Sequence, residues 1–227
     1  MGLFGINLFG SSPKYYLVPV KLNVSHVSQE GRPECGIASV MMVLKYFGVK
    51  DLNRQKIKHM AELPYGKGSI CYGLGRAIAS YGVDAEIISH KTVRSKATKN
   101  LERSLDMGGV SLDDFKRDVE QMKEDAISAG VKIEIRDIGL NEVLSRLNRN
   151  TIPIVTVNPR RFFKSAEVSV HSLVLTGFDN HRVYYHDPMF YSDCNNVSRI
   201  DVFEEAMNDV NGGIIFASRR KAKWQTT

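Results

Sequence analysis

The stretch Gln29-Glu-Gly-Arg-Pro-Glu-Cys35-Gly36-Ile-Ala-Ser-Val-Met-Met-Val-Leu-Lys-Tyr-Phe-Gly48 decides the fold of this chain. Its first part is turn-prone, and its second part predicts a helix, because apolar residues recur there at steps of three and four positions. These apolar positions are Ile37, Val40, Met41, Leu44 and Phe47. Gly48 stands where a helix C-cap is expected. Cys35 therefore lies at the very beginning of a predicted helix.

The position of Cys35 suits a nucleophile. A thiol reacts as the thiolate, which the unpaired N–H groups and the macrodipole of a helix N-terminus favour. Cys71 also precedes a predicted helix, and Cys194 lies in the polar Ser192–Ser198 loop. Both match this placement less well, so we expect each of them to be a buried or incidental cysteine.

The segments around this helix predict an α+β fold in which N-terminal helices pack on a mostly antiparallel sheet. Periodicity and capping residues predict further helices at Leu52–Met60, Tyr72–Tyr81, Ser111–Gly130, Leu140–Asn148 and Val202–Met207. Strands are predicted within Tyr15–Val24 and at Val83–Ser89, Val131–Arg136, Ile152–Asn158, Val168–Phe178, Arg182–His186 and Gly213–Ser218. Helices dominate the first half of the chain and strands the second half.

Length and composition fit one domain over residues 1–227, since 227 residues that are 43% hydrophobic can form one sizeable core. We expect His90–Gly130 to be an insertion with one amphipathic helix. The formal charge of +6 lies partly in Lys91–Arg103 and in the basic tail, residues 219–227. No aromatic residues alternate with these charges as in single-strand-binding proteins, so we expect a solvated tail and no nucleic-acid partner.

The remaining sequence features predict a cytoplasmic protein without cofactor or metal. No apolar stretch reaches the roughly 20 residues that span a bilayer, and Met1–Ser12 lacks the basic start and cleavage site of a signal peptide. Three scattered cysteines suit a reducing compartment. The glycine-bearing segments lack a phosphate-loop pattern, and Cys and His residues are not clustered at zinc-ligand spacing.

A predicted hairpin supplies a base for the thiol. If Asp179 is the centre of a three-residue loop, His171 faces Asp187 across the two strands. The imidazole of His171 could then act as general base while the carboxylate of Asp187 orients it. A register slip of one residue would move one of them to the other face of the sheet and separate the pair.

The run from Gln29 to Gly48 resembles the nucleophile motif of papain-like cysteine peptidases of the bacteriocin-processing, double-glycine leader type. His171-Ser-Leu-Val-Leu-Thr-Gly177-Phe-Asp179 and Val183-Tyr-Tyr-His-Asp187-Pro188 are similar to the histidine strand of that family and its following Asp-Pro. The resemblance covers roughly Val24–Ala217 apart from the insertion. The sequence departs from the family pattern at Glu34 and Ser172, where aspartate and a bulky apolar residue are frequent.

The resemblance implies a papain-like fold and four catalytic residues. Cys35 would be the nucleophile, His171 the base and then the acid, and Asp187 the group that orients the histidine. Gln29 would donate to the oxyanion together with the backbone N–H of Cys35. No transporter segments follow the domain, so the resemblance implies a stand-alone member whose leader-peptide role does not transfer.

We therefore expect a cysteine peptidase or amide hydrolase that acts on a peptide or protein substrate through a thioester acyl-enzyme. Two alternatives use the same fold. In one, the thioester transfers its acyl group to an amine. In the other, the chain is a non-catalytic binding module that holds a partner by the helix of Ser111–Gly130 or by the basic tail. The sequence does not fix the substrate or the oligomeric state.

Overall fold

The fold is known from a computed structural model that describes residues 17–31, 33–63, 69–90, 110–163, 170–189, 195–210 and 212–220. Its centre is one eight-stranded sheet with the order β3-β2-β8-β4-β5-β6-β7, and β1 pairs with β5 beside this path. The strands are β1 (Val20–Lys21), β2 (Asp84–Ser89), β3 (Lys132–Ile135), β4 (Thr151–Val157), β5 (His171–Phe178), β6 (Arg182–His186), β7 (Asn196–Arg199) and β8 (Ile214–Ser218). All described pairings are antiparallel except that of β2 with β3.

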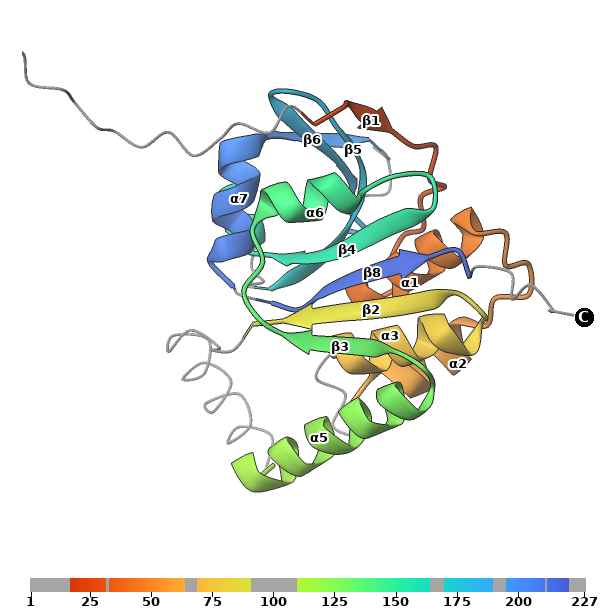
Figure 1. Cartoon of the computed structure of the whole chain (residues 1–227). Helices are drawn as coiled ribbons and strands as arrows, with labels where there is room; N and C mark the ends of the chain where they lie inside the picture. The colour runs from red at the N-terminus through yellow and green to blue at the C-terminus, as the bar shows by residue number, and fades with distance from the viewer. Residues whose placement is uncertain are drawn as a thin grey trace, which may run out of the picture.

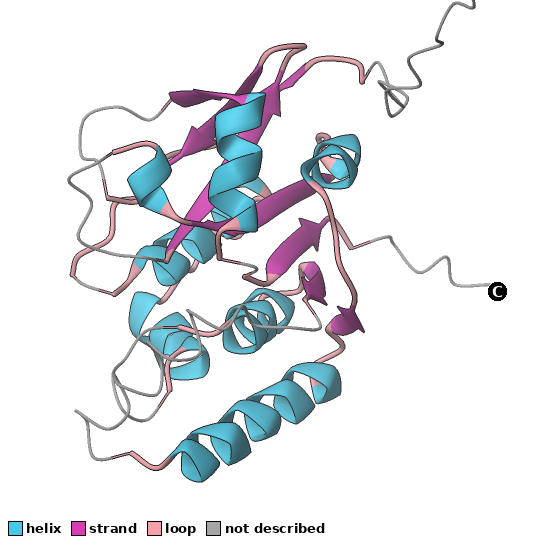
Figure 2. Cartoon of the chain, turned by 90° about the vertical axis from the view of Figure 1, so that its left-hand side faces the viewer, coloured by secondary structure: helices cyan, strands magenta, loops and turns pink. Residues whose placement is uncertain are grey.

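Helices cover both faces of this sheet, and the view in Figure 2 shows helices on both sides of the strands. Helices α1 (Cys35–Tyr46), α2 (Arg54–Ala61) and α3 (Cys71–Ser80) pack on one face. Helices α6 (Leu140–Arg146) and α7 (Ile200–Asn208) pack on the other face, in front of the strands in Figure 1. The α+β class and the mostly antiparallel sheet are thus confirmed.

Two hydrophobic cores follow from the alternation of side chains along the central strands. In β4, Ile152 and Ile154 join the core with α1 to α3, whereas Val155 and Val157 join the core with α6 and α7. Since both faces of these strands are buried, their sequences are nearly continuous apolar runs. The sheet is therefore a fixed platform between two layers of helices.

Helix α1 is buried more completely than its predicted apolar face required. Met42 and Val43 are fully buried in addition to Ile37, Val40 and Leu44, while Met41 is half-buried. The reason is that α1 packs against β5 and β4 as well as α2 and α3. Its C-terminus follows the prediction, because Gly48 has the positive φ of 87° that such a cap needs.

The segment around helix α5 (Leu112–Ser128) connects two parallel strands, β2 and β3. Ser111 caps this helix by accepting a hydrogen bond from the N–H of Asp114. The helix packs against α3, and among the residues of α5 only Ala126 is fully buried. That His90–Gly130 is an insertion stays a prediction, and its part at 91–109 lies outside the described residues, as does tail segment 221–227.

Strand β7 was not predicted, since Ser192–Ser198 was expected to be a polar loop. It pairs with β6 from Arg182↔Arg199 to Tyr185↔Asn196 and ends the strand order of the sheet. A polar sequence is compatible with this place, because a strand at the end of a sheet has one neighbour and can expose its side chains. Val197, for example, is half-exposed.

Candidate active site

Cys35 is the first residue of α1, as predicted. The preceding residue, Glu34, occupies the N-cap position but makes no side-chain capping bond. The first turn of α1 therefore directs backbone N–H groups and the positive end of the helix dipole toward the thiol. Cys35 is free of disulfide bonding and partly exposed.

The hairpin that carries His171 has a different register from the predicted one. Near the turn, Phe178 pairs with Val183 and Gly177 with Tyr184, and beyond a bulge Leu175 pairs with Tyr185. The expected pairs, His171 with Asp187 and Leu173 with Tyr185, are wrong. The turn lies later in the chain than predicted, because the N–H of Asp179 donates to the carbonyl of Arg182. The carboxylate of Asp179 also accepts hydrogen bonds from the N–H groups of His181 and Arg182.

The bulge between Leu175 and Gly177 nevertheless restores the pair that the prediction required. Without it, the register at the turn would continue along β5 and place His171 and Asp187 on opposite faces. The bulge adds one residue to β5 and changes the face of every residue before it. His171 and Asp187 thus become diagonal neighbours on one face, within reach of each other's side chains.

The side chains of His171 and Asp187 form a buried hydrogen bond of 2.7 Å between Nε2 and Oδ1. Each is 2% exposed. The same Oδ1 accepts a hydrogen bond of 2.8 Å from the N–H of Met189, which fixes the carboxylate. A carboxylate accepts from Nε2–H, so the Nδ1 atom of His171 is left for the thiol.

The pKa values of Cys35 and His171 move toward each other. Burial alone would raise the pKa of Cys35, but hydrogen bonding and charge from His171, and hydrogen bonds from Ser172, lower it below its ordinary value. Burial alone would lower the pKa of His171, but hydrogen bonds to Asp187 and Cys35 raise it to about 9. The two shifts favour a thiolate beside an imidazolium, which is the reactive form of a thiol nucleophile.

Ser172 is a contact that sequence reasoning missed. In the sequence it is only a departure from the family pattern, yet hydrogen bonding by its backbone and side chain helps to lower the pKa of Cys35. Its own carbonyl accepts a hydrogen bond from Ser39 of α1 at 3.5 Å. The one signal for this role was its place next to His171.

Gln29 lies in the loop that precedes α1 and is tied to the Asp187 segment. Its backbone N–H donates to the carbonyl of Pro188 at 2.9 Å. Its side-chain Oε1 is buried and has no hydrogen-bond partner among the described residues. The loop thus joins the predicted oxyanion donor to the strand end that carries Asp187.

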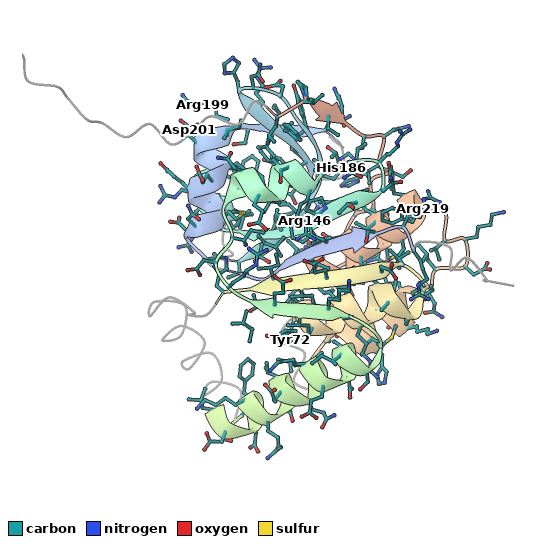
Figure 3. The ribbon with its side chains drawn as sticks, viewed as in Figure 1. Tyr72, Arg146, His186, Arg199, Asp201 and Arg219 are labelled. Atoms are coloured by element: carbon teal, nitrogen blue, oxygen red, sulfur yellow. The ribbon has the colours of Figure 1, made fainter. Side chains whose placement is uncertain are left out.

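Two histidines, His26 and His186, form hydrogen bonds between the Asp187 segment and the N-terminal part of the chain. The Nε2 of His26 donates to the carbonyl of Asp187 at 2.8 Å, and the Nε2 of His186 donates to the carbonyl of Val24 at 2.7 Å. Their rings meet edge to face at 5.6 Å. His186, labelled in Figure 3, is buried, and burial lowers its pKa below the ordinary value. Both imidazoles therefore hold backbone carbonyls of the segments that flank the site.

A narrow cleft of about 180 Å³ opens beside the thiol. Its lining includes Cys35, Cys71, Leu74, Ile154, His171 and Ile215. Ser69, Thr156 and Ser172 add polar surface to the cleft, which would admit a small group next to the thiol. A larger and more open hollow of about 550 Å³ lies beside β7, and none of the predicted site residues lines it.

Two other features, a metal site and a membrane-spanning helix, are absent from the described residues. No group of three or more His, Cys, Asp or Glu side chains is placed there to hold a metal ion. None of the described helices has both the length and the apolar composition that crossing a bilayer requires. Cys194 lies outside the described residues.

A family model described as guanylylate cyclase matches residues 24–212. The chain belongs to this family. The matched region of the guanylylate cyclase family includes Gln29, Cys35, His171 and Asp187, together with α1 and the hairpin of β5 and β6. No curated protein matches the chain.

Solved structures of low sequence identity share the fold. One is a C39-like peptidase from Bacillus anthracis, with 14% identity, 90% of this chain and 100% of that chain covered, and a TM-score of 0.55. Another is a double glycine motif protease from an AMS/PCAT transporter in complex with the leader peptide, with 16% identity, coverage of 88% and 97%, and a TM-score of 0.51. The peptidase domain of Streptococcus ComA, a bifunctional ABC transporter of a quorum sensing pathway, has 15% identity, coverage of 87% and 100%, and a TM-score of 0.50. This guanylylate cyclase family member therefore has the C39-like, papain-like peptidase fold.

Proposed function

We propose that the chain is a cysteine hydrolase that cleaves an amide bond in a peptide-like substrate through a thioester. The observation that carries this proposal is the buried hydrogen bond of 2.7 Å between His171 and Asp187, at a cleft that Cys35 and His171 both line. The opposed pKa shifts of Cys35 and His171 support it, since perturbed titrations gather at catalytic sites. The shared fold with C39-like peptidases supports a peptide-like substrate.

In the first half of the reaction, the thiolate of Cys35 attacks the carbonyl carbon and the π electrons move onto the oxygen. The amide of Gln29 and the N–H of Cys35 donate hydrogen bonds to this oxyanion. When the tetrahedral species collapses, the C–N bond breaks and the amine takes the proton of the His171 imidazolium. A thioester on Cys35 and a neutral imidazole remain.

In the second half, His171 removes a proton from water, whose oxygen attacks the thioester carbon. Collapse of the second oxyanion breaks the C–S bond, releases the carboxylic acid and regenerates the thiolate beside the imidazolium. The hydrogen bond from Nε2 of His171 to Asp187 orients the imidazole in both halves and leaves Nδ1 for the sulfur. A cytoplasmic location belongs to the proposal, because a reducing compartment keeps the thiol free.

The test is a peptide-library digestion followed by mass spectrometry, with Cys35→Ala as the control. Cleavage in H₂¹⁸O that adds one ¹⁸O to the new carboxyl group supports hydrolysis, whereas an adduct with an added amine supports acyl transfer. Absence of any cleavage, together with ordinary alkylation of Cys35 across pH, contradicts the catalytic proposal and favours a binding module.

The family description favours a second candidate function, the formation of a cyclic nucleotide from GTP. It is tested by incubating the protein with GTP and Mg²⁺ or Mn²⁺ and measuring cyclic GMP by mass spectrometry. Cyclic GMP formed equally by the protein and by Cys35→Ala would assign that activity to a site other than the thiol. Its absence, with peptide cleavage present, would leave the hydrolase as the function.

A further inference from the structure

The loop Ser28–Glu34, of which the structure describes residues 28–31, 33 and 34, leads into the nucleophile. One arginine of the next helix contacts Ser28, Glu30 and Glu34 in it. Arg54 is the first residue of α2, and its side chain is 13% exposed. Its Nη1 donates to Oε2 of Glu34 at 3.0 Å and its Nη2 to the carbonyl of Ser28 at 3.0 Å. Its Nε lies 3.1 Å from Oε1 of Glu30. One planar group thus bonds three residues of the loop.

The carboxylate of Glu34, which ends this loop, is buried next to Cys35 in the chain. The side chain of Glu34 is 8% exposed, and its second oxygen accepts from Nζ of Lys58 at 2.8 Å. Burial alone would raise the pKa of Glu34, but bonds from Lys58, the N–H of Glu30 and Arg54 lower it below its ordinary value. Glu34 is therefore a carboxylate whose charge is matched by two cations.

These contacts lie on both sides of Gln29. Arg54 donates to the carbonyl of Ser28, the residue before Gln29. The backbone N–H of Gln29 itself donates to the carbonyl of Pro188. Glu34 fixes the other end of the loop, one residue before the Cys35 N–H. An oxyanion site depends on donors held at hydrogen-bond distance from one point, so the loop geometry sets its quality.

We propose that Arg54 is a positioning residue that holds the Ser28–Glu34 loop so that the Gln29 amide and the Cys35 N–H converge on the oxyanion. This inference rests on the proposed function. It assigns to Arg54 a role in stabilising the oxyanion and not in forming the thiolate. Lysine cannot replace it, because one ammonium group does not reproduce a planar fork that bonds Glu34 and Ser28 together.

The test compares two reactions of Cys35 in Arg54→Lys. Iodoacetamide alkylates by displacement at carbon and needs only the thiolate, whereas acetylation by p-nitrophenyl acetate passes through an oxyanion. Both are followed by intact mass, with Cys35→Ala as the background. We expect the alkylation rate to stay within about twofold and acetylation to fall about 10- to 100-fold, since single oxyanion donors contribute effects of this order or larger.

The matched control is Arg146→Lys. Arg146 of α6 also bonds a carboxylate with two nitrogens, to Glu86 at 2.9 and 2.8 Å, and it lies on the other face of the sheet (Figure 3). In Arg146→Lys, the rates of alkylation and acetylation of Cys35 should both stay within about twofold of the wild-type rates. Glu34→Gln, which keeps the shape of the acceptor and removes its charge, should lower acetylation less than Arg54→Lys does.

Equal losses of alkylation and acetylation in Arg54→Lys would reduce Arg54 to a structural role and overturn the inference. Unchanged acetylation would overturn it as well. If Arg54→Lys fails to fold by circular dichroism, Glu34→Gln decides alone, and a selective loss of acetylation there supports the inference. A wild-type Cys35 that neither alkylates selectively nor becomes acetylated would instead overturn the proposed function itself.

Discussion

The N-termini of α1 and α3 form a natural comparison. Each helix begins with a cysteine, each lacks a side-chain cap, and Cys35 and Cys71 line the same cleft. Their thiols nevertheless differ, because the pKa of Cys35 is lowered whereas burial raises that of Cys71 to about 12. Backbone hydrogen bonds at the start of α3 lower the pKa of Cys71 without offsetting its burial.

The difference shows that a helix N-terminus alone does not make a reactive thiol. Cys35 has the imidazole of His171 and the polar groups of Ser172, while Cys71 has a packed environment that includes Gly213. At Cys35, the effect of His171 on the pKa outweighs that of desolvation. At Cys71, desolvation outweighs the backbone hydrogen bonds that lower the pKa. The predictions below test this comparison, from the largest expected effect to the smallest.

Removal of the two thiols should have very different consequences. We expect Cys35→Ala to lower peptide cleavage by about 10⁴-fold or more, because no other group can form the thioester. Cys71→Ala should change it severalfold at most, since its thiol is protonated at neutral pH. The measurement is the initial rate of cleavage of a peptide found in the library screen. Comparable losses in both variants would contradict the contrast.

Replacement of Asp187 should show how much catalysis depends on its hydrogen bond to His171. We expect Asp187→Asn to lower cleavage by about 10²- to 10⁴-fold, because an amide can stabilise the wrong tautomer of His171 and cannot stabilise its cation. The measurement is kcat/KM at neutral pH, with circular dichroism to verify folding. A loss below about threefold would show that the 2.7 Å bond to His171 has no catalytic role.

The pH dependence should differ between the two thiols and between two reactions of Cys35. The lowered pKa of Cys35 means that its thiolate is present below the ordinary titration range, so iodoacetamide should alkylate it near neutral pH and spare Cys71. Amide cleavage also needs the imidazolium, and since the pKa of His171 is raised to about 9, cleavage should decline as pH rises through about 9. Alkylation needs no imidazolium and should not decline there.

His171→Ala provides the control for this profile. Removing the imidazole removes the main cause of the lowered pKa, so the midpoint of Cys35 alkylation should move upward toward that of an ordinary thiol. The reactivity of Cys71, read from the same peptides by mass spectrometry, should not change. An unchanged Cys35 midpoint would break the assignment of His171 as its partner.

The hairpin shows what the sequence could predict and what it could not. Residue types and the motif were sufficient to select His171 and Asp187 as hydrogen-bond partners, although the predicted register that placed them directly opposite each other is wrong. The actual register depends on the capping of the turn by Asp179 and on the bulge before Gly177. Two local deviations that compensate each other leave no trace in a hydrophobic pattern.

Long-range polar contacts were equally hidden. Glu34 appeared only as an unusual residue before the nucleophile, and its bonds to Arg54 and Lys58 join segments 20 and 24 positions apart. Likewise, Cys71 was judged incidental without any means to see that it lies in the same cleft as Cys35. Periodicity predicts which side of a helix is buried but not which polar groups meet across a turn.

The smallest effect concerns the close packing of Cys71 against Gly213. A Cβ atom at Gly213 would lie 2.8 Å from Sγ and 3.0 Å from Cβ of Cys71, both closer than ordinary contact. We expect Gly213→Ala to lower the free energy of unfolding by about 1 to 3 kcal/mol, as overpacking does. Gly139→Ala adds the same methyl group at a position with open space and should cost about 1 kcal/mol or less.

A double-mutant cycle in urea makes this test specific. In Cys71→Ala the sulfur is gone, so adding Gly213→Ala should cost less than it does in the wild type, and the two losses should not be additive. Alkylation of Cys35 should be unchanged in all three proteins, because the contact involves the other thiol. Additive losses would contradict an energetic contact between Gly213 and Cys71.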